Sequence, residues 1–284
     1  MLPRLILLTS LLLSAQAFAQ AGVRDKIVTA DPDPRAPGSF ELQLTYLSSQ
    51  SSTAFDTLSL VTGGQSQREQ LFVGSLGYGL SEDLDLTLTS GASQLLSVVD
   101  PDRQQTARFL GGPRRGGGLV DLELDLRWRF HNDPEEGLTM AVVGGPTLAN
   151  DLIPSRDERS LTLGQGFLGA DIAFVLRQDW GPASINWETY TLFPLAGPSQ
   201  RFSALGTNLG LGYQINSQLQ PVVELNYARI QSSQEGLVQS LAATVGLVAQ
   251  PWDWCKLSLG WQQTLWGTNT EKAGSLIGGL SFSL

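Results

Sequence analysis

The sequence predicts an all-β fold, a transmembrane antiparallel up-and-down β-barrel of about 12 strands. Three observations predict it: an N-terminal export signal, apolar and polar residues that alternate in most segments, and connections that alternate between short and long. Successive side chains of a strand point to opposite faces, so alternation gives each strand one apolar and one polar face. After export, the apolar face would meet lipid and the polar face would line a barrel interior.

The clearest alternation lies in Val120–Phe130 (V-D-L-E-L-D-L-R-W-R-F). Every second residue is aliphatic or aromatic, and the residues between them are all charged. A helix, at about 100° per residue, would spread both sets around its circumference. This stretch therefore predicts a strand with one wholly apolar and one wholly charged face.

The first 19 residues have the features of a secretory signal peptide. Arg4 supplies a positive start, Leu5–Leu13 is a short apolar core, and Ala17-Phe18-Ala19 places small residues before a cleavage site. The apolar core is too short to span a bilayer as a helix. The sequence thus predicts a signal peptide over 1–19 and export to the bacterial outer membrane.

Residues 20–38 are polar and rich in proline, with Asp31-Pro32-Asp33-Pro34 in the middle. Such composition is typical of an irregular segment. We expect a flexible N-terminal lead over 20–38, followed by the barrel over 39–284.

Composition narrows the class of protein further. A net charge of −9 and a pI near 4.6 argue against a nucleic-acid partner. The single cysteine, Cys255, excludes an intramolecular disulfide framework. Thirty-one glycines and 16% charged residues suit a β protein with many turns and close backbone contacts.

Twelve strands are expected along the chain. They are Phe40–Tyr46, Glu69–Leu80, Leu84–Thr89, Val120–Phe130, Leu138–Leu148, Leu168–Arg177, Ala183–Phe193, Leu205–Tyr213, Val223–Tyr227, Leu241–Ala249, Cys255–Trp261 and Leu276–Leu284. Tight turns are expected near 81, 133, 179, 216 and 251, and generally longer loops near 57, 107, 155, 197, 234 and 269. Ser48–Gln67 and Ser97–Gly118 are the longest irregular stretches. Outer-membrane barrels alternate short periplasmic turns with longer external loops in this way.

Aromatic residues and the last strand agree with a membrane barrel. Two groups are expected at opposite strand ends: Tyr78, Trp128, Phe130, Trp180, Tyr213, Trp252 and Trp254, and then Tyr46, Tyr190, Phe193, Tyr227 and Trp266. Rings at two membrane interfaces produce two such belts, although a general preference of aromatics for strand ends would do the same. Leu276–Leu284 resembles the C-terminal signal read by the barrel-assembly machinery, with Phe282 two residues before the end.

Neither catalysis nor metal binding has suitable residues. The only histidine, His131, is expected at a periplasmic turn, and Cys255 on the lipid face, where a thiol is inert. The pairs Asp31/Asp33 and Asp100/Asp102 lack the ligand count of a Ca²⁺ site. Arg114-Arg115, in a glycine-rich stretch, suggests a mobile basic loop near lipopolysaccharide phosphates. We expect no enzyme, no metal and no cofactor.

Charged residues on the inner faces are the candidate functional residues. As pore-lining candidates the sequence gives Asp85, Asp121, Glu123, Asp125, Arg127, Arg129, Asp171, Arg177, Glu188, Glu224 and Lys256. They could form cross-strand salt bridges that pack a narrow barrel and set its register. They could also form an electrostatic constriction that selects solutes.

Two stretches carry a family resemblance. Gly117–Leu122 followed by Leu126–Phe130, and the turn Tyr78–Leu86, resemble signatures of the outer-membrane barrels named for the MetA pathway of phenol degradation. The resemblance implies a porin-like channel or transporter for small, apolar or aromatic solutes, with outer-membrane lipid and lipopolysaccharide around it. The alternative is a structural or adhesive barrel whose lumen is occluded by inward charges and Ser97–Gly118.

Overall fold

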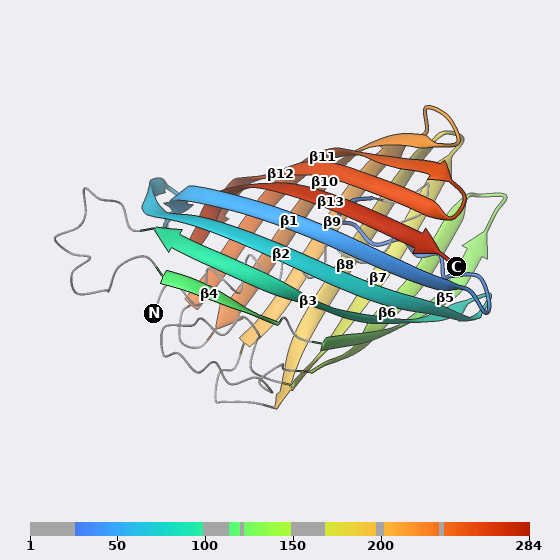
Figure 1. The fold of residues 1–284 in the computed structure, drawn as a ribbon, viewed down its shortest axis with the longest axis horizontal. Helices are drawn as coiled ribbons and strands as arrows, with labels where there is room; N and C mark the ends of the chain where they lie inside the picture. The colour runs from blue at the N-terminus through green and yellow to red at the C-terminus, as the bar shows by residue number, and fades with distance from the viewer. Residues whose placement is uncertain (1–25, 99–113, 120–121, 149–167, 197–201, 233–235) are drawn as a thin grey trace.

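The computed structural model describes residues 26–98, 114–119, 122–148, 168–196, 202–232 and 236–284. The expected signal peptide lies outside these residues. Within them, no helix is long and apolar enough to cross a membrane. All regular structure in the described chain is β-strand (Figure 1).

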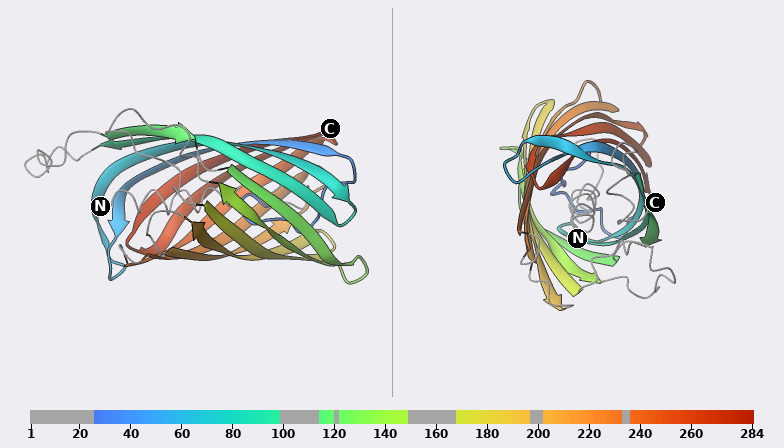
Figure 2. Two further views of the ribbon diagram at one scale, coloured as in Figure 1. Left: turned by 90° about the horizontal axis from the view of Figure 1, so that it is seen from below. Right: turned by 90° about the vertical axis from the view of Figure 1, so that its left-hand side faces the viewer.

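The strands are β1 (Phe40–Phe55), β2 (Val61–Ser81), β3 (Leu84–Val98), β4 (Arg114–Leu119), β5 (Leu122–Asp133), β6 (Leu138–Leu148), β7 (Leu168–Trp180), β8 (Ala183–Ala196), β9 (Phe202–Tyr213), β10 (Leu219–Ser232), β11 (Gly236–Trp252), β12 (Cys255–Thr268) and β13 (Thr270–Ser283). Sequential neighbours other than β4 and β5 pair antiparallel, β5 pairs with β3, and β1 pairs with β13. The sheet therefore closes into a barrel of twelve strands, and the predicted fold class is confirmed (Figure 2).

The thirteenth strand, β4, extends the wall beyond β5. Both pair with β3: β5 with its first half, Leu84–Thr89, and β4 with its second half, Ala92–Ser97. The prediction of one irregular stretch over Ser97–Gly118 is therefore wrong, and Arg114-Arg115 lie in a strand rather than a loop. Residues 99–113 lie outside the described chain.

Two other expected connections are shorter than predicted. The Ser/Thr-rich stretch 48–67 is mostly strand, because β1 runs to Phe55 and β2 begins at Val61, with Asp56–Leu60 as the tip. Between β12 and β13 a single residue, Asn269, makes the turn at φ 52°. Hydroxyl-rich sequence signals loops by propensity, but pairing across two long strands overrides that preference.

The five expected tight turns are present. Residues 82–83, 134–137, 181–182, 214–218 and 253–254 connect strands at one end of the barrel, which we call the turn end. The opposite end is the loop end. The first residue of β1, Phe40, pairs with Leu284 through two backbone hydrogen bonds, so β1 starts and β13 finishes at the turn end.

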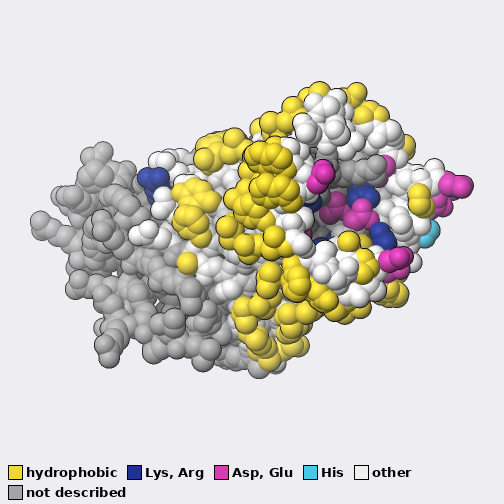
Figure 3. All heavy atoms as spheres, turned by 45° about the vertical axis from the view of Figure 1, so that its right-hand side comes forward, with side chains coloured by type: hydrophobic (Ala, Val, Ile, Leu, Met, Phe, Trp, Pro, Cys, Tyr) yellow, Lys and Arg dark blue, Asp and Glu magenta, His cyan; other side chains and the backbone are white. Residues whose placement is uncertain are grey.

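The outer face carries the apolar half of the alternation. In β5, Leu124, Leu126, Trp128 and Phe130 are exposed, Trp128 by 55%, while Arg127 between them is buried. A band of hydrophobic side chains covers much of the face seen in Figure 3. At the turn end, Trp254 stacks on Trp252 at 5.4 Å and on Phe282 at 6.2 Å between ring centroids. Exposed apolar side chains over so large an area suit a surface in contact with lipid.

A stretch of the chain outside the sheet lies within the barrel. Residues Lys26–Arg35, which we call the luminal segment, have no regular structure and cross the interior behind the strands (Figure 2). Residues 26–32 are buried, 33–35 are partly buried, and 36–38 are exposed at the turn end. The composition of 20–38, polar and proline-rich, contains no signal for this burial.

Candidate functional site

The inner wall contacts the luminal segment through groups of polar side chains and through two apolar clusters. The polar groups lie on β1, β3, β5, β7, β8 and β10, so the segment crosses the lumen instead of following one strand. Charged side chains gather in the hollow seen at the turn end in Figure 3.

Glu224 on β10 holds the inner end of the segment. Its carboxylate, fully buried, accepts hydrogen bonds from the backbone N–H groups of Ile27, Val28 and Thr29. The Thr29 hydroxyl donates a fourth, at 2.8 Å. Successive N–H groups that converge on one anion form a nest, which offsets part of the cost of burying the charge.

Glu188 on β8 extends this contact toward the middle of the segment. It accepts hydrogen bonds from the Ala30 N–H at 3.2 Å and from the Asn208 side chain at 2.8 Å. Asn186, two residues before it and on the same face, donates to the Ala30 carbonyl at 3.2 Å. The backbone of Ala30 is therefore bound on both its donor and its acceptor side.

Behind Asn208 the inner wall continues as an uncharged polar network. Asn226 donates to Asn208 and accepts from the Thr244 hydroxyl, at 3.2 and 3.0 Å. Gln262 donates to both Asn226 and Thr244. Sequence reasoning missed these residues because it looked for charge, although all of them stand at inward positions of the alternation.

Three arginines bind the acidic middle of the segment. Arg177 on β7 pairs with Asp31 at 2.7 Å and with Asp33 at 2.6 Å. Arg127 on β5 donates to the backbone carbonyls of both aspartates. Arg129 pairs with Asp33 at 3.2 Å and with Asp83 in the turn between β2 and β3 at 2.9 Å. These charge-assisted contacts fix the Asp-Pro-Asp stretch against β5 and β7.

Where the segment joins the barrel, the segment supplies the positive charge, Arg35, and the wall supplies the carboxylates. The Arg35 guanidinium pairs with Glu41 on β1 at 2.8 Å and with Asp85 on β3 at 3.1 Å. It also donates to the Thr87 hydroxyl at 2.9 Å. Arg127 lies 3.6 Å from the other oxygen of Asp85, so the two clusters share that carboxylate.

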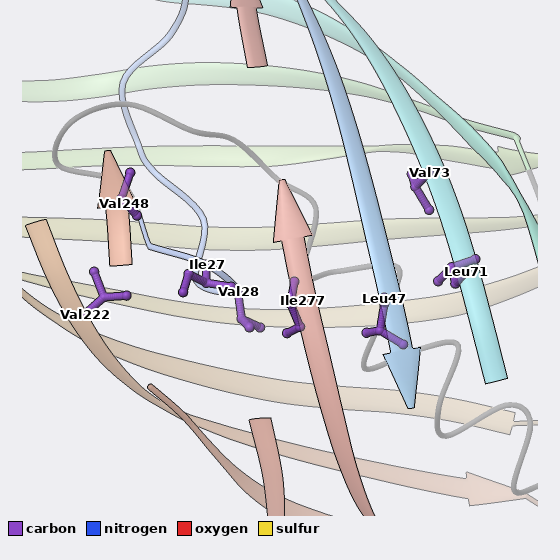
Figure 4. Close-up of a cluster of buried hydrophobic side chains, with 8 residues drawn as sticks. All are labelled: Ile27, Val28, Leu47, Leu71, Val73, Val222, Val248 and Ile277. Carbon is purple, nitrogen blue, oxygen red and sulfur yellow. The ribbon is translucent and has the colours of Figure 1, made fainter. Parts of the chain in front are cut away.

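One apolar contact is made by Ile27 and Val28, and another by Ala30, which is buried with Val143, Ala173, Val175 and Tyr190. Ile27 and Val28 are buried in a cluster with Leu47, Leu71, Val73, Val222, Val248 and Ile277, drawn in Figure 4. Val222 and Val248 come from β10 and β11, and the others come from β1, β2 and β13. Ile27 and Val28 thus bridge two sides of the inner wall.

Glycines on the inner wall leave room for the segment. A Cβ at Gly77 would overlap the guanidinium of Arg35, and a Cβ at Gly79 the carbonyl of Ala36. A Cβ at Gly260 would lie 2.7 Å from the end of the Ile27 side chain. Close approach of another backbone is a reason for glycine within a strand. Some of the many glycines in the sequence therefore make room for the luminal segment.

Ten of the eleven pore-lining candidates lie in the described chain, and Asp121 lies outside it. Six contact the luminal segment or share its ion pairs: Asp85, Arg127, Arg129, Arg177, Glu188 and Glu224. Asp125 and Asp171 lie close enough to each other to interact electrostatically. Glu123 is partly buried on β5, and Lys256 on β12 is near enough to Glu41 for an electrostatic interaction.

Residues considered for other chemistry stay apart. In the described part of the chain, no three His, Cys, Asp or Glu side chains are grouped so that they could hold a metal ion. His131 is exposed in β5, and Cys255 is buried at the start of β12. Asp100 and Asp102 lie outside the described residues.

Comparison with known proteins identifies the class of fold. No family model and no curated protein matches the chain. Among solved structures, an outer-membrane channel from Pseudomonas putida F1 matches with a TM-score of 0.75 and 14% identity, over 91% of this chain and 100% of that one. The β-domain of the Bordetella autotransporter BrkA matches with a TM-score of 0.51 and 12% identity, over 87% and 100% of the two chains.

The Pseudomonas putida toluene transporter TodX matches over 94% of this chain and 99% of that one, at 8% identity. Its TM-score of 0.48 is too low to support a conclusion about this chain. At these identities a likeness shows the fold alone. The chain has the closed β-barrel fold of outer-membrane proteins, which implies a lipid environment for its outer face. The resemblance to the family of the MetA pathway stays a prediction.

Proposed function

We propose that this chain is an outer-membrane channel for small solutes of apolar or aromatic character. The observation that carries the proposal is a closed barrel with an apolar outer face and an inner face rich in charged and polar groups. Charged groups within a barrel interact with ions and polar groups that pass them. The fold shared with the channel of Pseudomonas putida F1 supports this assignment.

Inward apolar residues support the apolar part of the proposal. Leu47, Leu71 and Ile277 are adjacent across β2, β1 and β13 and face inward, because Leu47 pairs with Leu71 on one side and Ile277 on the other. With Val73 they form an aliphatic strip on the inner wall. A solute with an apolar body would make favourable contacts there, since each buried CH₂ contributes about 0.8 kcal/mol.

Environment and assembly belong to the same proposal. The outer face would contact lipid and lipopolysaccharide in the bacterial outer membrane. The barrel-assembly machinery would recognise the strand that contains Leu276–Leu284. Transport does not require catalytic chemistry, so we propose no enzymatic activity.

Single-channel recording of the purified protein in planar bilayers tests the proposal. A conducting pore supports it. A protein that inserts as a folded barrel yet never conducts, with or without its luminal segment, would instead be a structural barrel. The segment within the lumen favours this second function, because it fills space that a solute would need.

Charge selectivity tests the proposed pore-lining residues. Neutralising Asp121, Glu123 and Asp125 together should shift the reversal potential toward anion preference, and neutralising Arg127 and Arg129 should shift it toward cations. Both shifts should shrink as salt rises, because the Debye length falls from about 10 Å at 0.1 M to about 3 Å at 1 M. Unchanged potentials at intact conductance would mean that these charges are buried structural pairs.

A further inference from the structure

The luminal segment is bound by side chains of a wall whose backbone ladder is complete without it. The hydrogen bonds and ion pairs between the segment and the wall join backbone to side chain, or side chain to side chain. Backbone-to-backbone pairing with the wall begins after it, where the Gly38 N–H bonds the Gly79 carbonyl. The barrel ladder closes through β1–β13 and β2–β3 without any residue of the segment.

Charge on the wall is complementary to the segment from Ile27 to Arg35. Carboxylates Glu41 and Asp85 face Arg35, arginines 127 and 177 face Asp31 and Asp33, and carboxylates Glu188 and Glu224 face backbone N–H groups. Burying an ion costs several kcal/mol unless hydrogen bonds or an opposite charge compensate. In a lumen, water can replace those partners once the segment leaves, so its release costs less than opening a packed core would.

The connection to the barrel can act as a pivot. Burial decreases from residues 26–32 to the exposed residues 36–38. Pro32, Pro34 and Pro37 fix their own φ angles and so restrict the conformations of this connection. Arg35 lies beside the point of attachment and is bound to β1 and β3 rather than to the far wall. The inner part of the segment can therefore leave while Arg35 stays bound.

We propose that the barrel interior is a peptide-binding site whose resident ligand is residues 26–33 of the same chain, and that occupancy of this site closes the channel. The site comprises the Glu224 nest, the Arg127–Arg177 pair and the apolar cluster around Ile27 and Val28. The proposal rests on the proposed channel function. It adds a closed state and a peptide ligand to that function.

The first experiment removes the ligand and supplies it again. A variant that lacks residues 20–33 retains Arg35 and should conduct several-fold more than the full mature chain. A synthetic peptide of residues 20–33, added at the turn end where the segment enters, should block that variant. The same peptide with Asp31→Asn and Asp33→Asn loses its charges toward Arg177 and should block it less.

The second experiment keeps the full chain and fixes the segment in place. Ile27→Cys with Gly260→Cys, in a Cys255→Ser background, should form a disulfide, because a Cβ at 260 would contact the Ile27 side chain. Oxidation should hold the channel at low conductance, and reduction should release it. Ile27→Cys with Gly278→Cys is the matched control. Gly278 pairs with Leu259, whose side chain is exposed on the outer face. A cysteine at 278 would therefore also face outward and should not cross-link.

The outcomes separate this inference from the proposed function. If the deletion variant conducts and the cross-linked channel conducts equally well, the segment is not a closing element, and the channel function stands. If the deletion variant and the full chain are both folded and silent, the channel function is wrong, and the closing role falls with it. A deletion variant that conducts more, peptide block, and low conductance that reduction relieves would together support the proposal.

Discussion

The barrel wall and the luminal segment are stabilised in different ways. Each strand of the wall except β4 is bound by backbone hydrogen bonds to two neighbours, and the outer apolar face of the wall is placed for contact with lipid. The segment has no strand partner over residues 26–35 and depends on particular side chains of the wall, above all Glu224, Arg127 and Arg177. A single substitution on the inner wall can therefore loosen the segment alone, whereas a substitution on the outer face acts on the wall itself.

The largest effect is expected on the wall. Leu124→Arg places a charge on the outer face of β5, where Leu124 is exposed, and should cost about 2–4 kcal/mol near the middle of the membrane. Asp125→Asn, the matched control on the inner face, should cost much less because Asp125 faces Asp171 and not lipid. The folded fraction in lipid vesicles, read from the different gel mobility of unboiled and boiled protein, measures both. Equal folded fractions would mean that the two faces are wrongly assigned.

The next effect is expected on the segment alone. Glu224→Ala removes the acceptor of three backbone N–H groups and of the Thr29 hydroxyl. A buried donor left unpaired costs about 1–3 kcal/mol, so amide exchange at residues 27–29 should accelerate about tenfold or more, since 1.4 kcal/mol is a factor of ten.

Glu271→Ala is its control. Glu271 is another inward carboxylate, but its recorded partner is the Ser51 hydroxyl on β1. Exchange at residues 27–29 should be unchanged in this variant. Faster exchange in both variants, or exchange of the wall strands along with the segment, would show that the segment and wall unfold as one unit.

The same difference explains what could be predicted from sequence. A strand has a fixed period of two, so alternation in β5 gave its faces, although the strand runs on to Asp133 where a turn was expected from His131. The inward direction of Arg127, Glu188 and Glu224 followed from the same period. Residues 26–35 have no period, and their proline and aspartate content predicts only irregular structure. Their hydrogen-bond partners come from strands up to 197 residues away, as for Ile27 and Glu224, and no local pattern encodes such a contact.

A smaller effect is expected where the segment leaves the barrel. Gly79→Ala would place a Cβ against the carbonyl of Ala36, whereas Gly278→Ala meets nothing within 4 Å. Overpacking costs about 1–3 kcal/mol, and we expect the low end of this range because Ala36 is exposed and can move. Amide exchange of residues 26–35 should rise in the first variant and stay constant in the second. Equal exchange in both would mean that Gly79 is not needed for the close approach.

The smallest effect is expected at Arg129. It pairs with Asp33 and Asp83, whose side chains are 40% and 56% exposed, so water and salt screen both pairs. Exposed ion pairs contribute about 0–1 kcal/mol, and Arg129→Gln should increase amide exchange of the segment by less than about fivefold. Arg177→Gln removes a guanidinium that is only 5% exposed and binds both Asp31 and Asp33, so its effect should be larger. Raising the salt from 0.1 to 1 M should reduce the difference in exchange rate between Arg129→Gln and the parent protein. The corresponding difference for Arg177→Gln should change less, because buried pairs are screened less. Equal effects at the two positions would mean that the acidic stretch is solvated in the membrane protein and that Arg177 does not hold the segment inside the barrel.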